Sequence, residues 1–112
     1  MQIEVLGSSS LGNAYIVNDG TTSILLECGF SLVDMQMKSN FMISNVDACL
    51  LTHFHQDHSK GIKDLLKYAI DVYALPETLS ALGVADHHRT HNVVPQKAFT
   101  INTFTRLLTI SF

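Results

Sequence analysis

Four side chains able to bind a metal ion fall within six consecutive positions of this sequence. The segment THFHQDHSKG, residues 52–61, contains His53, His55, Asp57 and His58. The simplest alternative is a set of unrelated surface groups close to the start of a helix. Four ligands at the junction of a strand, a loop and a helix are rarely accidental, however, so the pattern favours a metal site.

The spacing of these residues suits two adjacent ions better than one. His53 and His55 are two positions apart, and alternate residues of an extended chain point to the same side, so both imidazoles can reach one ion. Asp57 and His58 follow where the chain turns toward a helix, which gives them a different direction. In two-metal hydrolytic sites the ions lie roughly 3.5–4 Å apart and share a hydroxide. Imidazole and carboxylate without thiolate favour two Zn2+ ions, with Mn2+ or Fe2+ as alternatives.

The ligand segment lies between a predicted strand and a predicted helix. Residues 47–53 form a short apolar run that is typical of a buried strand. Ser59 is expected to cap the next helix, and the polar residues of that helix are expected to face away from the core. Its inward-facing residues recur at helical spacing: Ile62, Leu65, Leu66 and Ala69.

The remaining elements predict an α/β fold with a mixed β-sheet and flanking helices. Ser31 is expected to cap a helix over about 32–39, with Leu32, Val33 and Met35 turned inward. A helix from Pro76 to Gly83 and a polar connection over 87–97 are expected further along the chain. The other segments read as strands between turn signals: 2–6, 14–18, 22–28, 71–75 and one or two strands over 98–112.

The composition favours a single folded domain over residues 1–112. The chain is 46% hydrophobic and 15% charged, which excludes a disordered tail, and its net charge of −3 argues against a broad basic surface for nucleic acid but not against a local groove. No apolar run approaches the roughly 20 residues of a membrane span, and the N-terminus does not resemble a signal peptide, so a cytoplasmic protein is expected. Cys28 and Cys49 lie in apolar segments without CxxC spacing and are expected to be buried and reduced.

A second group of histidines lies in the segment DHHRTH, residues 86–91. His87 and His91 have HxxxH spacing, which would place both on one face of a helix. Gly83 ends the preceding helix, however, so a surface loop is favoured over a metal-binding role for His87, His88 and His91.

The sequence resembles the metallo-β-lactamase-fold superfamily, whose HxHxDH signature is present as residues 53–58. The GSSSLGN opening, residues 7–13, is most similar to the branch of YycJ-type proteins, which are implicated in nucleic-acid hydrolysis. The resemblance covers nearly all of residues 2–97 and implies the N-terminal half of an αββα sandwich. Its matching segments follow the family's order: 6–17, 24–29, 46–62 and 72–83.

This resemblance implies a role for each residue of the signature. His53 and His55 would bind the first metal ion and Asp57 and His58 the second, and Asp57 as the catalytic residue would also orient the bridging hydroxide. Metal ions make such a hydroxide available at neutral pH by lowering the pKa of water from 15.7 to near 7. The expected activity is metal-dependent hydrolysis, with a phosphodiester of nucleic acid or of a nucleotide as the substrate. Glu27, where many relatives have Asp, is expected to be structural.

Three further ligands that the family carries in its second half have no counterpart here. Residues 92–112 contain no His, Asp, Glu or Cys. We therefore expect a truncated domain, for which the alternative function is a catalytically incomplete remnant or a non-enzymatic metal-binding or interaction module. Without a second sheet, apolar residues of the first would be exposed. A homodimer formed through this uncovered sheet would be another way to complete the site.

Overall fold

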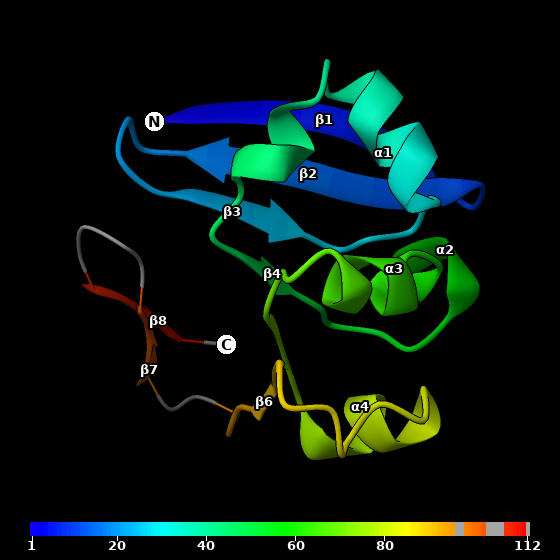
Figure 1. The fold of residues 1–112 in the computed structure, drawn as a ribbon, viewed down its shortest axis with the longest axis vertical. Coiled ribbons are helices and arrows are strands. Elements are labelled where there is room, and N and C mark those ends of the chain that lie inside the picture. The colour runs from blue at the N-terminus through cyan, green and yellow to red at the C-terminus, as the bar shows by residue number, and fades with distance from the viewer. Residues whose placement is uncertain (96–97, 103–106, 112) are drawn as a thin grey trace.

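The computed structural model describes residues 1–95, 98–102 and 107–111, and its largest element is a six-stranded mixed sheet in which the strands lie in chain order (Figure 1). The strands are β1 (Gln2–Ser9), β2 (Gly12–Asn18), β3 (Ser23–Leu26), β4 (Ala48–Leu50), β5 (Val72–Ala74) and β6 (Thr90–Asn92). The pairs β1–β2 and β2–β3 are antiparallel, whereas β3 to β6 are parallel. Because parallel strands end at the same edge, residues that follow β3 and β4 meet there.

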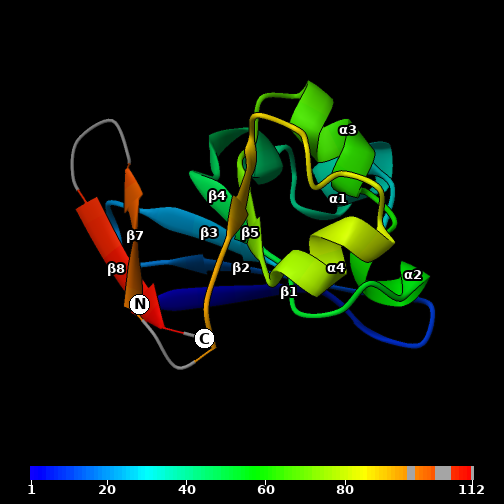
Figure 2. The ribbon, with the colours of Figure 1, turned by 90° about the horizontal axis from the view of Figure 1, so that it is seen from below.

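Helices cover one face of this sheet (Figure 2). The first is α1 (Leu32–Lys38), where the Ser31 hydroxyl accepts a hydrogen bond of 3.2 Å from the backbone N–H of Asp34 as predicted for an N-cap. The remaining helical segments are the 3-10 turn η1 (Met42–Asn45), α2 (Gln56–Ser59), α3 (Ile62–Lys67) and α4 (Pro76–Ala81). No helix among the described residues is long and apolar enough to cross a membrane.

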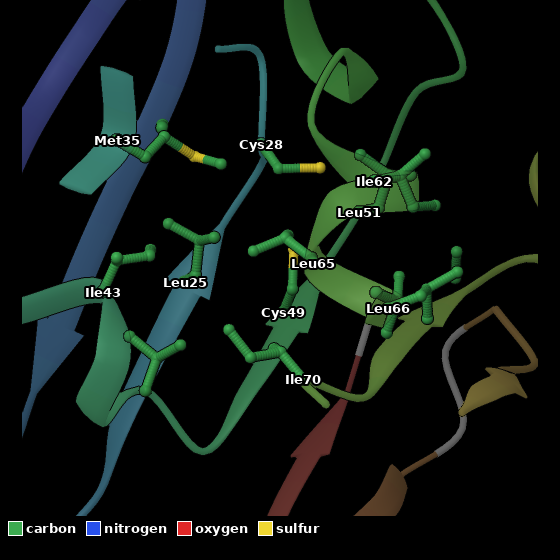
Figure 3. Packing of buried hydrophobic residues seen from close by; sticks show 14 of the residues in the cluster. Leu25, Cys28, Met35, Ile43, Cys49, Leu51, Ile62, Leu65, Leu66 and Ile70 are labelled. Carbon is green, nitrogen blue, oxygen red and sulfur yellow. The ribbon is translucent and has the colours of Figure 1, made fainter. Parts of the chain in front are cut away.

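The main hydrophobic core lies between the sheet and these helices. Figure 3 shows Leu25 and Cys49 from the sheet packed against Met35 of α1 and Leu65 of α3, and all four are fully buried. Both cysteines are free and buried, as predicted. The hydrogen bond with the Cys28 thiol, together with burial, raises the pKa of the Cys49 thiol well above its usual range.

The opposite face of the sheet is partly covered by a hairpin of β7 (Ala98–Asn102) and β8 (Leu107–Ser111), which pair antiparallel in a separate sheet (Figure 2). Ile101 is 1% exposed and forms a second small core with Ile24, Ala48 and Leu50. On β1, at the far end of the sheet, Ile3 and Val5 remain 64% and 58% exposed. The expectation that no second sheet covers this face is therefore wrong at β3 and β4, which the β7–β8 sheet covers, whereas apolar residues of β1 are exposed as expected.

Four local predictions were wrong. Ala69 is exposed and lies beyond the end of α3 at Lys67, because its backbone has a left-handed φ of 67°. Val33 is 66% exposed, because it lies two positions from the buried Met35 and therefore about 200° around the helix. Ser59 belongs to α2 and does not cap α3; its hydroxyl donates instead to the carbonyl oxygens of Phe54 and His55, at 2.8 and 2.9 Å. The polar connection over 87–97 contains β6, which pairs with β5 through backbone groups that a polar sequence does not reveal.

Candidate metal centre

The segment that carries the four predicted ligands leaves the sheet at the carboxyl end of β4. Its C-terminal part is tied to the chain that follows β3: the N–H of Cys28 donates to the carbonyl of His58 at 2.8 Å, and the N–H of Gly61 donates to the carbonyl of Cys28 at 2.8 Å. These bonds hold residues 51–61, which we call the ligand loop, against the end of the neighbouring strand. The location matches the edge at which α/β sheets usually bind ligands.

Glu27, directly after β3, is the buried charged group beneath the ligand loop. It is 6% exposed and its backbone has a φ of 65°. One carboxylate oxygen accepts hydrogen bonds from the backbone N–H of Thr52 at 2.9 Å and from the Thr52 hydroxyl at 2.5 Å. The other lies 2.9 Å from Nδ1 of His58. A buried carboxylate with this many donors is satisfied, and both of its oxygens are engaged.

This network determines which nitrogen each imidazole presents to solvent. The single hydroxyl proton of Thr52 is donated to Glu27, so the 2.7 Å contact between Thr52 Oγ1 and His53 Nδ1 requires the proton of that contact to come from His53. His58 likewise donates its Nδ1 proton to Glu27. With Nδ1 as the donor in each contact, Nε2 is the nitrogen that each neutral ring has left to ligate a metal.

The two imidazoles lie side by side. The ring centroids of His53 and His58 are 4.6 Å apart with an interplanar angle of 42°. Potential ligand atoms of Glu27, His53 and His58 all lie within 4.8 Å of one another. Because the Glu27 oxygens are engaged by Thr52 and His58, we assign Glu27 the role of orienting the imidazoles. Two neighbouring imidazoles, each with Nε2 left available, fit a site for a divalent ion.

The other two predicted ligands lie at the margin of this cluster. One carboxylate oxygen of Asp57 is 3.6 Å from His58 Nε2, and the side chain is 33% exposed. His55 is exposed at the N-cap of α2, with its ring centroid 4.8 Å from that of Phe54. Within the part of the chain that the structure describes, neither belongs to the group of three mutually close ligand atoms. The division of the four residues between two ions therefore stays a prediction.

The second group of histidines makes separate contacts on the surface. His87 and His88 stack with ring centroids 4.7 Å apart, and Nδ1 of His87 accepts a hydrogen bond from the N–H of Arg89 at 3.1 Å. His91 lies on β6, where its Nε2 is 2.8 Å from a carboxylate oxygen of Asp71 and its ring stacks on Tyr73. The HxxxH pair thus has different partners at its two ends.

Comparison with known proteins defines the class to which this fold and site belong. Residues 9–102 match the family model of the metallo-beta-lactamase superfamily, and the chain belongs to that superfamily. The solved structure of the metallo-beta-lactamase SMB-1 in complex with mercaptoacetic acid superposes with a TM-score of 0.61 at 20% identity, over 80% of this chain and 43% of that one. The mixed sheet flanked by helices is therefore the fold of this superfamily, as predicted.

Sequence comparison also identifies individual relatives within this superfamily. The chain is 31% identical over 97 residues to the exodeoxyribonuclease WalJ of Streptococcus pneumoniae serotype 2 (strain D39 / NCTC 7466), a match that covers 78% of this chain and 36% of the relative. It is 33% identical over 86 residues to the exodeoxyribonuclease YycJ of Bacillus anthracis, covering 73% and 33%. The predicted resemblance to YycJ-type proteins is thus confirmed, and the chain spans about a third of the length of these relatives.

The sequence did not predict the contact of Glu27 with a residue of the metal-binding signature. Glu27 was expected to be structural, yet it contacts His58, 31 positions later in the sequence. The signal available was the position of an acid directly after a buried apolar strand, at the sheet edge where the ligand loop also begins. A buried acid at such an edge needs a partner, and the imidazoles were the available donors.

Proposed function

We propose that this chain is a metal-dependent hydrolase that acts on phosphodiester bonds of nucleic acid or of a nucleotide. The observation that carries the proposal is the pair of neighbouring imidazoles, His53 and His58, whose Nδ1 atoms contact Thr52 and Glu27 so that Nε2 of each ring is left for a metal ion. The names of the relatives WalJ and YycJ, both exodeoxyribonucleases, support nucleic acid as the substrate class.

We assign the metal ions to the four residues of the signature. His53, His55, Asp57 and His58 would hold two Zn2+ ions, with Mn2+ or Fe2+ as alternatives, since this donor set contains imidazole and carboxylate and no thiolate. When bound, such ions acidify coordinated water and offset the negative charge that develops on the phosphate. Asp57 would act as the catalytic residue. Its half-buried carboxylate beside His58 can orient the attacking water and accept its proton.

The test is hydrolysis of end-labelled DNA by the purified chain. Chain stripped of metal and resupplied with Zn2+ or Mn2+ should shorten single- or double-stranded oligonucleotides, and a chelator should abolish the reaction. Asp57→Ala should lower the rate at least about 100-fold, because a general base typically contributes 10²–10⁴-fold. Asp86→Ala, which removes an exposed carboxylate next to His87, is the matched control and should leave the rate unchanged. Metal uptake below one ion per chain without cleavage would refute the proposal.

A second function, a non-enzymatic interaction module, is favoured by one specific observation. The exposed Ile3 and Val5 of β1 give the sheet an apolar margin that is unusual for a surface strand. We propose a second copy of the chain as the occupant, because two such strands can meet around a twofold axis. Tight metal uptake without turnover, combined with self-association through β1, would favour this function over hydrolysis.

A further inference from the structure

Asn13 connects the first hairpin of the fold to the ligand loop. It is the second residue of β2, just after the turn that joins β1 to β2. Its side-chain amide donates to the carbonyl of Asp57 at 3.1 Å, across 44 positions of sequence, and lies 3.5 Å from a carboxylate oxygen of the same residue. The same nitrogen donates to the carbonyl of Ser9 at 2.8 Å, which fixes the side chain in place within its own hairpin.

The backbone of Asn13 is fixed as well. Its carbonyl accepts a hydrogen bond of 2.9 Å from the N–H of Gly29, just beyond the end of β3. Gly29 in turn allows the ligand loop to approach closely, because a Cβ atom there would lie 1.9 Å from the carbonyl oxygen of Asp57 and 2.6 Å from the backbone nitrogen of Asn13. Three segments that are distant in sequence therefore meet at Asn13, Gly29 and Asp57.

The Asn13 amide restrains both the backbone and the side chain of Asp57. The bond to the carbonyl fixes the backbone where α2 begins, and the approach to one carboxylate oxygen restricts rotation of the side chain. The oxygen nearest Asn13 is also the one 3.6 Å from His58 Nε2. The Asn13 amide is a neutral donor, so it can stabilise the Asp57 carboxylate without the positive charge of a Lys or Arg, which would repel a metal ion. Groups that orient a ligand in this way typically contribute 10–100-fold to metal affinity.

We infer that Asn13 is a positioning residue for Asp57, and that it selectively strengthens the binding step in which Asp57 takes part. This inference rests on the proposed function, which makes Asp57 a metal ligand. It assigns the GSSSLGN hairpin a role in the centre beyond that of a turn. Removal of the Asn13 amide should weaken the ion held by Asp57 and leave the ion held through His53 unaffected.

The test is a titration of the metal-free chain with Co2+, followed by visible absorption and by the number of ions bound. Asn13→Ala should weaken the binding step that is also weakened by Asp57→Ala, by about 10–100-fold, and leave the other step within about twofold of wild type. Leu11→Ala is the matched control, because Leu11 is 87% exposed in the same hairpin, and it should change neither step. Thermal unfolding of each metal-free variant provides a readout that is independent of metal.

The outcomes separate the two ideas. If the wild-type chain takes up no Co2+, the proposed function fails. If Asp57→Ala weakens one step and Asn13→Ala weakens none, the proposed function stands and the inference is overturned. Equal weakening of both steps with a lower unfolding temperature would show a general folding role and also overturn it. Should Asn13→Ala fail to fold, Asn13→Ser is the second variant, because it keeps a small polar side chain but lacks the amide that donates to Asp57.

Discussion

At the scale of single residues, the centre depends on a carboxylate that contributes through hydrogen bonds. Glu27 is buried, accepts two bonds from Thr52 and one from His58, and thereby determines the tautomers of both imidazoles. The backbone N–H of Thr52 cannot reverse its direction, so the group beside it must be an acceptor. A substitution at position 27 can therefore replace only the oxygen that faces His58 by a donor.

Glu27→Gln should therefore weaken metal binding without a large change in size. The amide oxygen must face Thr52, which places the NH2 group against His58 Nδ1 and forces the His58 proton onto Nε2, where it blocks ligation. We expect metal affinity to fall about 10–100-fold. Nitrogen chemical shifts of the imidazole in the metal-free chain report the tautomer directly. Glu77→Gln, at an exposed position in the first turn of α4, is the control; a His58 that keeps its Nδ1 proton in Glu27→Gln would contradict the network.

Tyr73 gives the fold a dependence on alkaline pH. Burial and, to a smaller extent, the negative charge of Asp71 raise the pKa of its phenol above the ordinary value of 10.0. The folded chain thus favours the neutral phenol, so this contribution to stability is present below pH 10 and is lost as pH rises through the folded-state pKa. Denaturant unfolding between pH ~9 and ~11.5 should show a steeper loss of free energy in wild type than in Tyr73→Phe. Equal slopes would contradict this.

At the scale of elements, the sequence predicted what depends on local pattern. The strands from β1 to β5, the helix capped by Ser31 and the start of α4 at Pro76 follow from apolar periodicity and turn residues. The predictions failed where the decisive partner is distant or the segment is short. α2 has four residues with no apolar period, and β6 consists of Thr90, His91 and Asn92, whose pairing with β5 depends on backbone groups.

The candidate site divides in the same way. The four signature residues were predicted from type and spacing, because they are close in sequence, and the structure brings His53 and His58 of them together. The contacts of Glu27 with Thr52 and His58 and of Asn13 with Asp57 join segments between 25 and 44 positions apart. These contacts form because β2, β3 and β4 are neighbours in the sheet. A single sequence does not specify this arrangement in detail. The side-chain cluster of His53 with His58, instead of with His55, is a consequence of that arrangement.

Gly29 tests the close approach of two elements. Gly29→Ala would place a methyl group within 1.9 Å of the Asp57 carbonyl, so either the ligand loop or the β1–β2 hairpin must move. We expect a loss of about 1–3 kcal/mol in the free energy of unfolding, typical of overpacking, together with weaker metal binding. Gly20→Ala is a stringent control: a Cβ there meets no atom within 4 Å, but the φ of 94° imposes its own strain. Metal binding should fall only in Gly29→Ala; a fall in neither would show that the approach is not required.

At the scale of the whole molecule, the two faces of the sheet differ in their cover. Helices bury one face, whereas the β7–β8 hairpin covers β3 and β4 on the other and leaves Ile3 and Val5 of β1 exposed (Figure 2). β1 is also an edge strand of eight residues, and long edge strands with apolar side chains readily pair with other chains. Both properties favour contact between copies at this margin.

Ile3→Lys should therefore reduce self-association. Light scattering after size-exclusion chromatography should show a concentration-dependent dimer for the wild-type chain and a monomer for the variant, because a charge at the centre of an apolar contact is costly to bury. Val33→Lys on α1 is the matched control, since Val33 is 66% exposed and Ile3 is 64% exposed. A wild-type chain that is monomeric at all concentrations, or equal effects of the two substitutions, would exclude β1 as the contact.

The left-handed backbone at Glu27 lowers the stability of the fold, whereas its side chain orients the imidazoles. A non-glycine residue with a φ of 65° carries a conformational penalty of about 1–2 kcal/mol, which glycine would avoid. Glycine at position 27 would relax the main chain but would leave both imidazoles free to turn and to exchange tautomers. The chain thus retains a strained residue where an unstrained one is available, and this is the behaviour expected of a position kept for what its side chain does.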